Sequence, residues 1–298
     1  MDNKLIQFSL SFEGNETDGH QIDLYDASQA LVGFQRTLAL TTSLVLNGEL
    51  ITQAPSLKNA TILASPPQEG SWKLVATIMI GGYYLLTVPK DTILGNLIYS
   101  AYDFVIKENL GFHPTLDESL VVQYEQFHKN QKDSTSLNIA KLQSLSEKCQ
   151  NSVRDIHRPI YAKGTASSAI IQYIQNESYK QVGPKLNRNT YESLIGLKQN
   201  TELEWFIGRI SSYDVNAQKG RIFLPELLRT IPFELERNCL SIPQREKIID
   251  SLKSYQQLKD KHSDVGFIRF NGYRVTNFQN DIKKIFVIGM DNVVPDIG

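Results

Sequence analysis

An uncharged stretch of fifteen residues, 74–88 (LVATIMIGGYYLLTV), restricts the possible folds of this chain more than any other feature. It ends at Pro89, and a second apolar stretch at 93–106 contains Asp103 as its one charge. A helix needs about 20 residues to cross the hydrocarbon of a bilayer, so both stretches are short for a standard span. We expect 74–106 to lie in a protein core. The alternative is a membrane-acting effector that inserts this segment as a hairpin.

The composition predicts a folded chain without a disulfide framework. Of the 298 residues, 41% are hydrophobic and 21% are charged, which allows burial to offset chain entropy. Cys149 and Cys239 lie far apart in the sequence, without the spacing of a structural zinc site. Residues 1–12 lack the basic start and the apolar core of a secretory signal. We therefore expect a cytoplasmic protein with reduced thiols and no metal.

The first ninety residues predict a sheet with one packed helix. Apolar residues at helical spacing cover 27–46, between Asp26 as N-cap and the helix-ending pair Asn47 and Gly48. Alternation with a period of two is typical of strands. It predicts strands at 5–12, 20–24, 58–65 and 71–80. Together these elements indicate an antiparallel sheet backed by a helix within 1–90.

A helical middle is expected over 92–180, and its last helix is predicted at 166–177. The stretch 176–189 contains a Gly-Pro pair and is the predicted linker. We therefore place a domain boundary near 185. It divides the chain into an α+β domain, 1–185, and a second domain, 186–298.

The sequence of the second domain predicts a small β-barrel. Three strands, a helix and two or three further strands follow one another in the order of oligonucleotide/oligosaccharide-binding (OB) barrels. The pair Asn271 and Gly272 is typical of a type-I′ hairpin turn. The strands are expected at 202–213, 221–224, 229–236, 265–270, 273–278 and 284–290, and the helix at 244–258. The expected fold class is thus α+β: an antiparallel sheet with one packed helix, a helical middle, and an OB-like barrel with an inserted helix.

The segment 208–224 (GRISSYDVNAQKGRIFL) resembles the opening hairpin of cold-shock-type barrels, although that family lacks an inserted helix. The resemblance implies base stacking on exposed aromatic residues. Single-stranded nucleic-acid binding would then use Arg209, Tyr213, Arg221, Phe223 and Arg269. Against this, residues 201–298 carry 14 Lys and Arg against 13 Asp and Glu, so the barrel has no strong positive field. A hairpin whose aromatic residues serve only packing is the other interpretation.

No catalytic, cofactor-binding or metal-binding motif is present in the sequence. It contains no HExxH, no GxSxG and no phosphate-binding GxxxxGK. A hidden enzyme would need Asp103, His113 and Asp117 to converge in a pocket, which sequence alone cannot show. The basic residues Lys148, Arg154, His157, Arg158 and Lys163 suit a helix C-terminus, with phosphate binding as the alternative. We expect no cofactor and favour a non-enzymatic protein.

The chain also resembles a group of uncharacterised bacterial two-domain proteins that are linked with mobile-element and phage-defence loci. The resemblance rests on five segments: DASQALVGF (26–34), QEGSW (68–72), YDFVI (102–106), RPIYAKGTASSA (158–169) and GRISSYD (208–214). It implies an α+β front half, a small barrel at the back and a role in antiviral defence. It assigns no chemistry to any residue.

Trp72, Tyr83 and Tyr84 lie in an apolar run that exceeds what one small sheet needs. Aromatic residues of this kind favour protein interfaces. We therefore expect a non-enzymatic binding or assembly component of a bacterial complex, which contacts a protein partner or further copies of itself.

Overall fold

The computed structural model describes residues 6–51, 57–65, 72–81, 91–112, 114, 122, 124–125, 139–175, 178–227, 229–237, 239–257, 266–277, 280 and 282–291. The chain forms two compact units, Met1–Leu194 and Ile195–Gly298. The expected α+β class is confirmed, because the first unit holds an antiparallel sheet with helices and the second a closed barrel. The following paragraphs treat each unit by itself.

The first unit is built on a five-stranded antiparallel sheet in the order β2-β3-β1-β4-β5. Its strands are β1 (Ile6–Glu13), β2 (Ala60–Ser65), β3 (Trp72–Ile80), β4 (Ser168–Gln175) and β5 (Ser178–Asn187). The central strand β1 alternates as its sequence predicts. Ile6, Phe8, Leu10 and Phe12 are at most 4% exposed and belong to the hydrophobic core.

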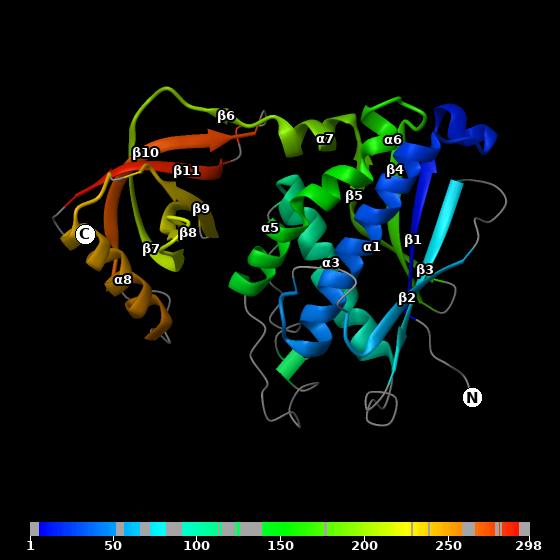
Figure 1. Ribbon diagram of the computed structural model, residues 1–298, viewed down its shortest axis with the longest axis horizontal. Helices are drawn as coiled ribbons and strands as arrows, with labels where there is room; N and C mark the ends of the chain where they lie inside the picture. Colours follow the sequence, from blue (N-terminus) through cyan, green and yellow to red (C-terminus); the bar gives the residue numbers. More distant parts are fainter. Residues whose placement is uncertain are drawn as a thin grey trace. The chain divides into compact units, whose positions relative to one another are not determined.

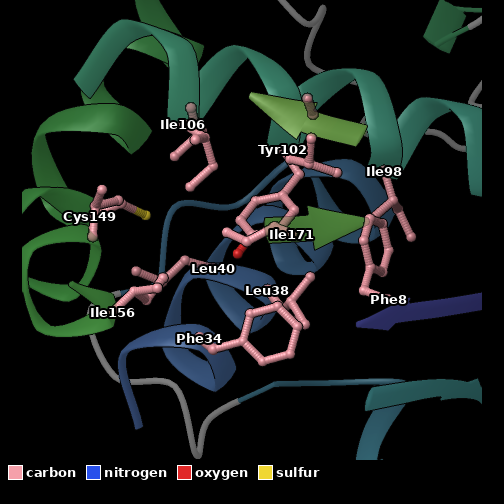
Figure 2. Packing of buried hydrophobic residues seen from close by; sticks show 14 of the residues in the cluster. Phe8, Phe34, Leu38, Leu40, Ile98, Tyr102, Ile106, Cys149, Ile156 and Ile171 are labelled. Carbon is pink, nitrogen blue, oxygen red and sulfur yellow. The ribbon is translucent and has the colours of Figure 1, made fainter. Parts of the chain in front are cut away.

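Three long helices lie on the same side of this sheet: α1 (Leu24–Asn47), α3 (Asp91–Leu110) and α5 (Ile139–Ile156) (Figure 1). Helix α1 begins where the Asp23 carboxylate accepts a hydrogen bond from the Asp26 amide, and it ends at Gly48 with φ 66°. The expected N-cap was wrong, because Asp26 lies within the first turn of the helix and Asp23 caps it. Shorter elements complete the unit: η1 (Asn15–Gly19), α6 (Arg158–Tyr161) and α7 (Arg188–Ile195). The core between sheet and helices surrounds Tyr102, as Figure 2 shows.

Three segments of the first unit differ from expectation. Residues 20–24 form no strand, because η1 follows β1 directly and α1 begins at Leu24. The predicted helix at 166–177 is strand β4, and the predicted linker at 176–189 contains strand β5. The two strands pair with each other and with β1, so they complete the sheet rather than connect domains. For this reason both strands belong to the first unit, which extends to Leu194, within ten residues of the boundary expected near 185.

The described part of the apolar segment 74–106 lies in the core of the first unit. Strand β3 pairs with β1 on one side and with β2 on the other. In α3, Leu97, Ile98 and Ala101 are fully buried in the same core. Within the ranges that the structure describes, no helix combines the length and the apolar character needed to cross a membrane.

The second unit is a five-stranded barrel that closes in the order β7-β8-β9-β11-β10-β7. Its strands are β7 (Glu204–Asp214), β8 (Lys219–Leu224), β9 (Arg229–Leu235), β10 (Ile268–Thr276) and β11 (Ile282–Met290). Only the β9 and β11 pair is parallel among the described barrel strands. Helix α8 (Ile242–Gln257) lies in sequence between β9 and β10, the third and fourth strands of the barrel, while β6 (Lys198–Gln199) and η3 (Pro225–Leu227) are short additions. This order confirms the expected OB-like barrel with an inserted helix.

The predicted hairpin turn at Asn271 and Gly272 does not exist, because β10 runs straight through both residues. The pairing of β10 with β11 shifts register between them, which indicates a bulge. A Cβ atom on Gly272 would lie 2.3 Å from the carbonyl oxygen of Phe286. Gly272 therefore permits close approach of β11 rather than a turn.

Candidate functional site

The predicted protein interface is described only at Trp72. Its ring packs edge-on against Phe12, with centroids 5.6 Å apart, and it is only partly exposed. Tyr83 and Tyr84 lie outside the described residues. The structure thus places Trp72 at the border of the core of the first unit.

The two central arginines of the predicted nucleic-acid surface are buried. Arg209 is 1% exposed, and its guanidinium lies 4.6 Å from the ring of Phe267, with further rings about it. Arg221 is 4% exposed and donates hydrogen bonds to the hydroxyl and the carbonyl oxygen of Thr230, at 3.3 and 3.2 Å. Neither guanidinium is presented to solvent, so neither can contact a phosphate without rearrangement.

The two predicted stacking aromatics also serve packing inside the barrel. Tyr213 stacks on the buried ring of Phe233, with centroids 6.0 Å apart and planes 10° from parallel. Burial raises the pKa of the Tyr213 hydroxyl above its usual value. Phe223 is partly buried and lies under the guanidinium of Arg209. The structure therefore favours the packing interpretation of the hairpin at 208–224.

Arg269, the fifth predicted residue, is different. Its side chain is 42% exposed, and its guanidinium lies 4.5 Å from the ring of Trp205. Arg269 pairs across the ladder with Ile207, which is 37% exposed, and Trp205 is 50% exposed. Leu203, just before β7, is also exposed. We call Leu203, Trp205, Ile207 and Arg269 the Trp205 platform.

The sequence contains a signal for this platform that our interpretation overlooked. Leu203, Trp205 and Ile207 alternate with Phe206 and Ile210, both of which point into the barrel core. A strand with large apolar residues on both faces presents one of those rows outward when only one face is covered. Attention to the outward row would have added Trp205 to the candidates, although Arg209 belongs to the same row and is covered by Tyr255 and Phe267.

Charges around the platform cancel one another. Arg269 faces Asp291, with the nearest guanidinium nitrogen 3.7 Å from the carboxylate. Arg274, further along the same strand, is 2.8 Å from a carboxylate oxygen of Glu204 and 3.9 Å from one of Glu226. Its guanidinium lies 5.5 Å from the ring of the core residue Phe206, so this pair is on the other face of the strands. The platform is therefore an exposed aromatic and aliphatic surface whose one cation, Arg269, faces a carboxylate.

A second cluster in the first unit joins two of the segments that carry the sequence resemblance. Arg158 donates a hydrogen bond of 2.7 Å to the carboxylate of Asp26, which is 1% exposed, and its guanidinium lies 4.8 Å from the ring of Tyr25. Lys163 donates to the carboxylate of Asp23 at 2.6 Å. We call these five residues the α1–α6 cluster.

Hydrogen bonds in this cluster shift the pKa of Asp23 and of Arg158. The hydrogen bond from Lys163 holds the pKa of the Asp23 carboxyl below its usual value. The hydrogen bond to Asp26 raises the pKa of the Arg158 guanidinium. Together the two pairs fasten the start of α1 to the segment after α5.

Asp103, from the predicted catalytic trio, has a structural position. Its carboxylate accepts a hydrogen bond from the Gly183 amide at 2.8 Å and pairs with Lys107 at 2.7 Å. It thus fastens α3 to the outer edge of β5. His113 and Asp117 lie outside the described residues, so the structure does not show whether the trio converges.

The predicted basic string does not form a continuous charged surface. His157 is fully buried between the carbonyl oxygen of Val153, at 2.8 Å, and the hydroxyl of Thr190, at 2.9 Å. Burial lowers the pKa of His157 to about 4, so the ring is neutral at pH 7. Arg158 and Lys163 are engaged with aspartates. In the part of the chain that the structure covers, no group of three His, Cys, Asp or Glu side chains is placed to hold a metal ion.

Comparison with known proteins identifies the first unit alone. Residues 8–192 match the model of a family described as a domain of unknown function, DUF7946. The match ends beside the limit of the first unit at Leu194 and leaves the barrel outside. Neither curated proteins nor solved structures gave a match. Because the family model covers more than half of its residues, the chain belongs to the DUF7946 family.

Proposed function

We propose that this protein is a non-enzymatic binding component that contacts a protein partner through the Trp205 platform of its OB-like barrel. The observation that carries the proposal is the pair formed by Trp205, 50% exposed, and the guanidinium of Arg269 that lies on its ring. A half-exposed Trp with a stacked Arg presents a large apolar surface together with the N–H hydrogen-bond donors of the guanidinium. Trp, Tyr and Arg dominate the binding energy of protein interfaces.

The surroundings of Trp205 favour a protein partner over a nucleic acid. Leu203 and Ile207 extend the apolar surface on either side of Trp205, as in the centre of a protein interface. Nucleic-acid affinity depends on cations that replace the counterions of phosphates. Arg269 and Arg274 each already face carboxylates, which reduces the positive potential available to a phosphate chain.

The non-enzymatic part of the proposal rests on the engagement of the candidate catalytic groups. Asp103 is held by Lys107 and by the Gly183 amide, and the carboxylate of Asp26 is held by Arg158. Burial raises the pKa of the Cys149 thiol to about 12, which removes its nucleophilic form at neutral pH. Membership of a bacterial defence complex stays a prediction of the sequence resemblance.

Single-stranded nucleic-acid binding by the same platform is the second candidate. The barrel strand order is that of OB folds, which use exposed aromatic residues to stack bases. Trp205 and Arg269 could together hold one base. This candidate predicts an affinity that falls steeply with salt, whereas an apolar protein contact changes little.

A photo-crosslinking amino acid at position 207, in the full chain inside its native cells, tests both candidates. We expect adducts that protease removes and nuclease leaves intact, and we expect Trp205→Ala to reduce their yield at least about tenfold. The matched control position is 215, because Val215 is 59% exposed but lies in the turn after β7. Nuclease-sensitive adducts would select the second candidate. Equal yields at positions 207 and 215 would refute the platform as a binding surface.

A further inference from the structure

The two edges of the sheet in the first unit differ in how their backbone groups are satisfied. At the β5 edge, α3 supplies partners: the Tyr99 hydroxyl donates to the carbonyl of Gln181 at 3.1 Å, and the Asp103 carboxylate accepts from the amide of Gly183 at 2.8 Å. At the β2 edge, no described residue outside β3 pairs with the strand. An unpaired strand edge is a template for another strand.

A contact at the start of β2 shows which of its residues direct their N–H and C=O groups toward β3 and which direct them away. The Gly81 amide donates to the carbonyl of Asn59 at 3.0 Å, so this carbonyl points toward β3. The N–H of Ala60 belongs to the same planar trans peptide group and therefore points away from β3. In an antiparallel ladder, alternate residues bond to the same neighbour. Residues 61, 63 and 65 therefore also bond to β3. The N–H and C=O groups of Ala60, Ile62 and Ala64 point away from the sheet.

We propose that β2 pairs with β2 of a second copy of this chain, antiparallel, about a twofold axis at Ile62. In this register Ile62 lies opposite Ile62 of the partner subunit, and Ala60 lies opposite Ala64 of the partner subunit. Each such pair exchanges two hydrogen bonds. Every outward-pointing group of Ala60, Ile62 and Ala64 then has a partner, and the sheet continues across both copies.

The chemistry of β2 suits a second copy as its occupant. The strand ATILAS has no charge and no proline, so it lacks the residues that usually block edge pairing, and two copies meet without like-charge repulsion. The register also keeps the two faces of the sheet in phase, because residues of equal parity lie opposite each other. Leu63, which is 48% exposed, would face Thr61 of the partner subunit and lose exposed surface.

The test uses the full chain and the substitution Ala64→Pro. Proline at position 64 removes an outward N–H and leaves the bonds of residues 63 and 65 to β3 intact, and it suits an edge strand. Ala64→Val is the matched control, because it adds a side chain of similar size and keeps the N–H. By light scattering across the micromolar range we expect a dimer for the wild type and for Ala64→Val, and a monomer for Ala64→Pro.

Hydrogen exchange on the unmodified chain keeps the proposal testable if Ala64→Pro fails to fold. The amides of Ile62 and Ala64 should exchange slowly at high protein concentration and quickly on dilution, while the amide of Leu63 stays protected throughout. A wild-type monomer at all concentrations would overturn the proposal, and so would a folded Ala64→Pro dimer. If the Ile62 amide exchanges slowly at every protein concentration, a segment of the same chain covers this edge, and the proposal is overturned. Trp205→Ala should leave the dimer intact, which separates this result from the binding role of the barrel.

Discussion

Arg158 in the first unit and Arg269 in the second lie on an aromatic ring and face an aspartate, yet their environments differ. The carboxylate of Asp26 is 2% exposed at its side chain and lies 2.7 Å from Arg158. The carboxylate of Asp291 is 29% exposed and lies 3.7 Å from Arg269. The same three residue types thus form a buried fastening in one unit and an accessible surface in the other.

This difference shows why a residue pattern alone does not identify a binding site. A buried carboxylate that loses its partner remains as an uncompensated charge in a medium of low dielectric constant. An exposed carboxylate that loses its partner is solvated by water. The first arrangement is costly to remove and so serves the fold. The second contributes little to the fold, which leaves Trp205 and Arg269 available for a ligand.

The substitution Arg158→Met should produce the largest loss in stability. It leaves the Asp26 carboxylate buried without its partner, and we expect the free energy of unfolding of the first unit to fall by more than in any other substitution of this series. The matched change Arg269→Met should lower that of the second unit by less than about 1 kcal/mol. The chain has two tryptophans, one in each unit. Trp72 fluorescence in a Trp205→Phe background reports urea unfolding of the first unit. Trp205 fluorescence reports urea unfolding of the second unit.

Lys163→Met supplies the control within the α1–α6 cluster. Lys163 is 66% exposed and Asp23 is 20% exposed, so the pair is largely solvated, and its removal should change the free energy of unfolding little. Equal losses for Arg158→Met and Lys163→Met would show that burial does not decide the effect. The comparison between the two units would then fail.

The fold was predictable from sequence wherever local pattern and tertiary structure agree. The helix expected at 27–46 is α1, because apolar residues at helical spacing and Gly48 at its end mark it locally, although Asp23 rather than Asp26 caps its start. The strand expected at 221–224 lies within β8. Residues 166–177 were misread as a helix since their polar residues hide a period of two. Gly272 was misread as a turn residue because only the approach of Phe286 explains it.

The candidate site was less predictable, because exposure depends on distant parts of the chain. Arg209 reads as a surface cation on β7, yet Tyr255 of α8 and Phe267 come from elsewhere in the sequence to cover it. Arg221 is buried against Thr230 of the next strand. Nothing within the segment 208–224 shows either contact. Trp205 was accessible to sequence reasoning through the alternation of its own strand.

Lowering the pH should weaken the first unit specifically, since it contains the buried His157. Its pKa is about 4 in the folded state and about 6.5 in the unfolded chain. Below pH 6.5 the unfolded state binds a proton that the folded state refuses, so stability decreases as the pH falls toward 4. A shift of this size corresponds to about 3 kcal/mol. The expected loss appears in Trp72 unfolding curves recorded between pH 7 and pH 4.

The variant His157→Gln isolates this effect from the titration of carboxylates. Glutamine keeps a donor and an acceptor but does not titrate. Between pH 7 and pH 4 we therefore expect the variant to lose about 3 kcal/mol less free energy of unfolding than the wild type loses. Trp205 unfolding curves should show no corresponding difference between wild type and variant. If the stability of the first unit depends on pH equally in the wild type and in His157→Gln, the pH dependence does not come from His157.

The smallest expected effect concerns two arginines of the same barrel, Arg209 and Arg269. Arg209 lies within 4.6 to 6.0 Å of three ring centroids and is 1% exposed, whereas Arg269 contacts one exposed ring. Cation–π attraction strengthens when the cation is desolvated. Methionine fills similar space without charge, so Arg209→Met should lower the stability of the second unit by about 2 kcal/mol, more than Arg269→Met. The measurement is urea unfolding followed by Trp205 fluorescence.

Arg209→Lys separates the charge of Arg209 from its shape. Lysine keeps the positive charge but lacks the planar group that stacks on aromatic faces, so we expect a loss similar to that of Arg209→Met. Full stability in Arg209→Lys would show that charge alone matters at this position. If Arg209→Met itself is neutral, the desolvation of the guanidinium cancels its attraction to the rings. In that case burial would not distinguish the two arginines, and exposure would be the one property that marks Arg269 for binding.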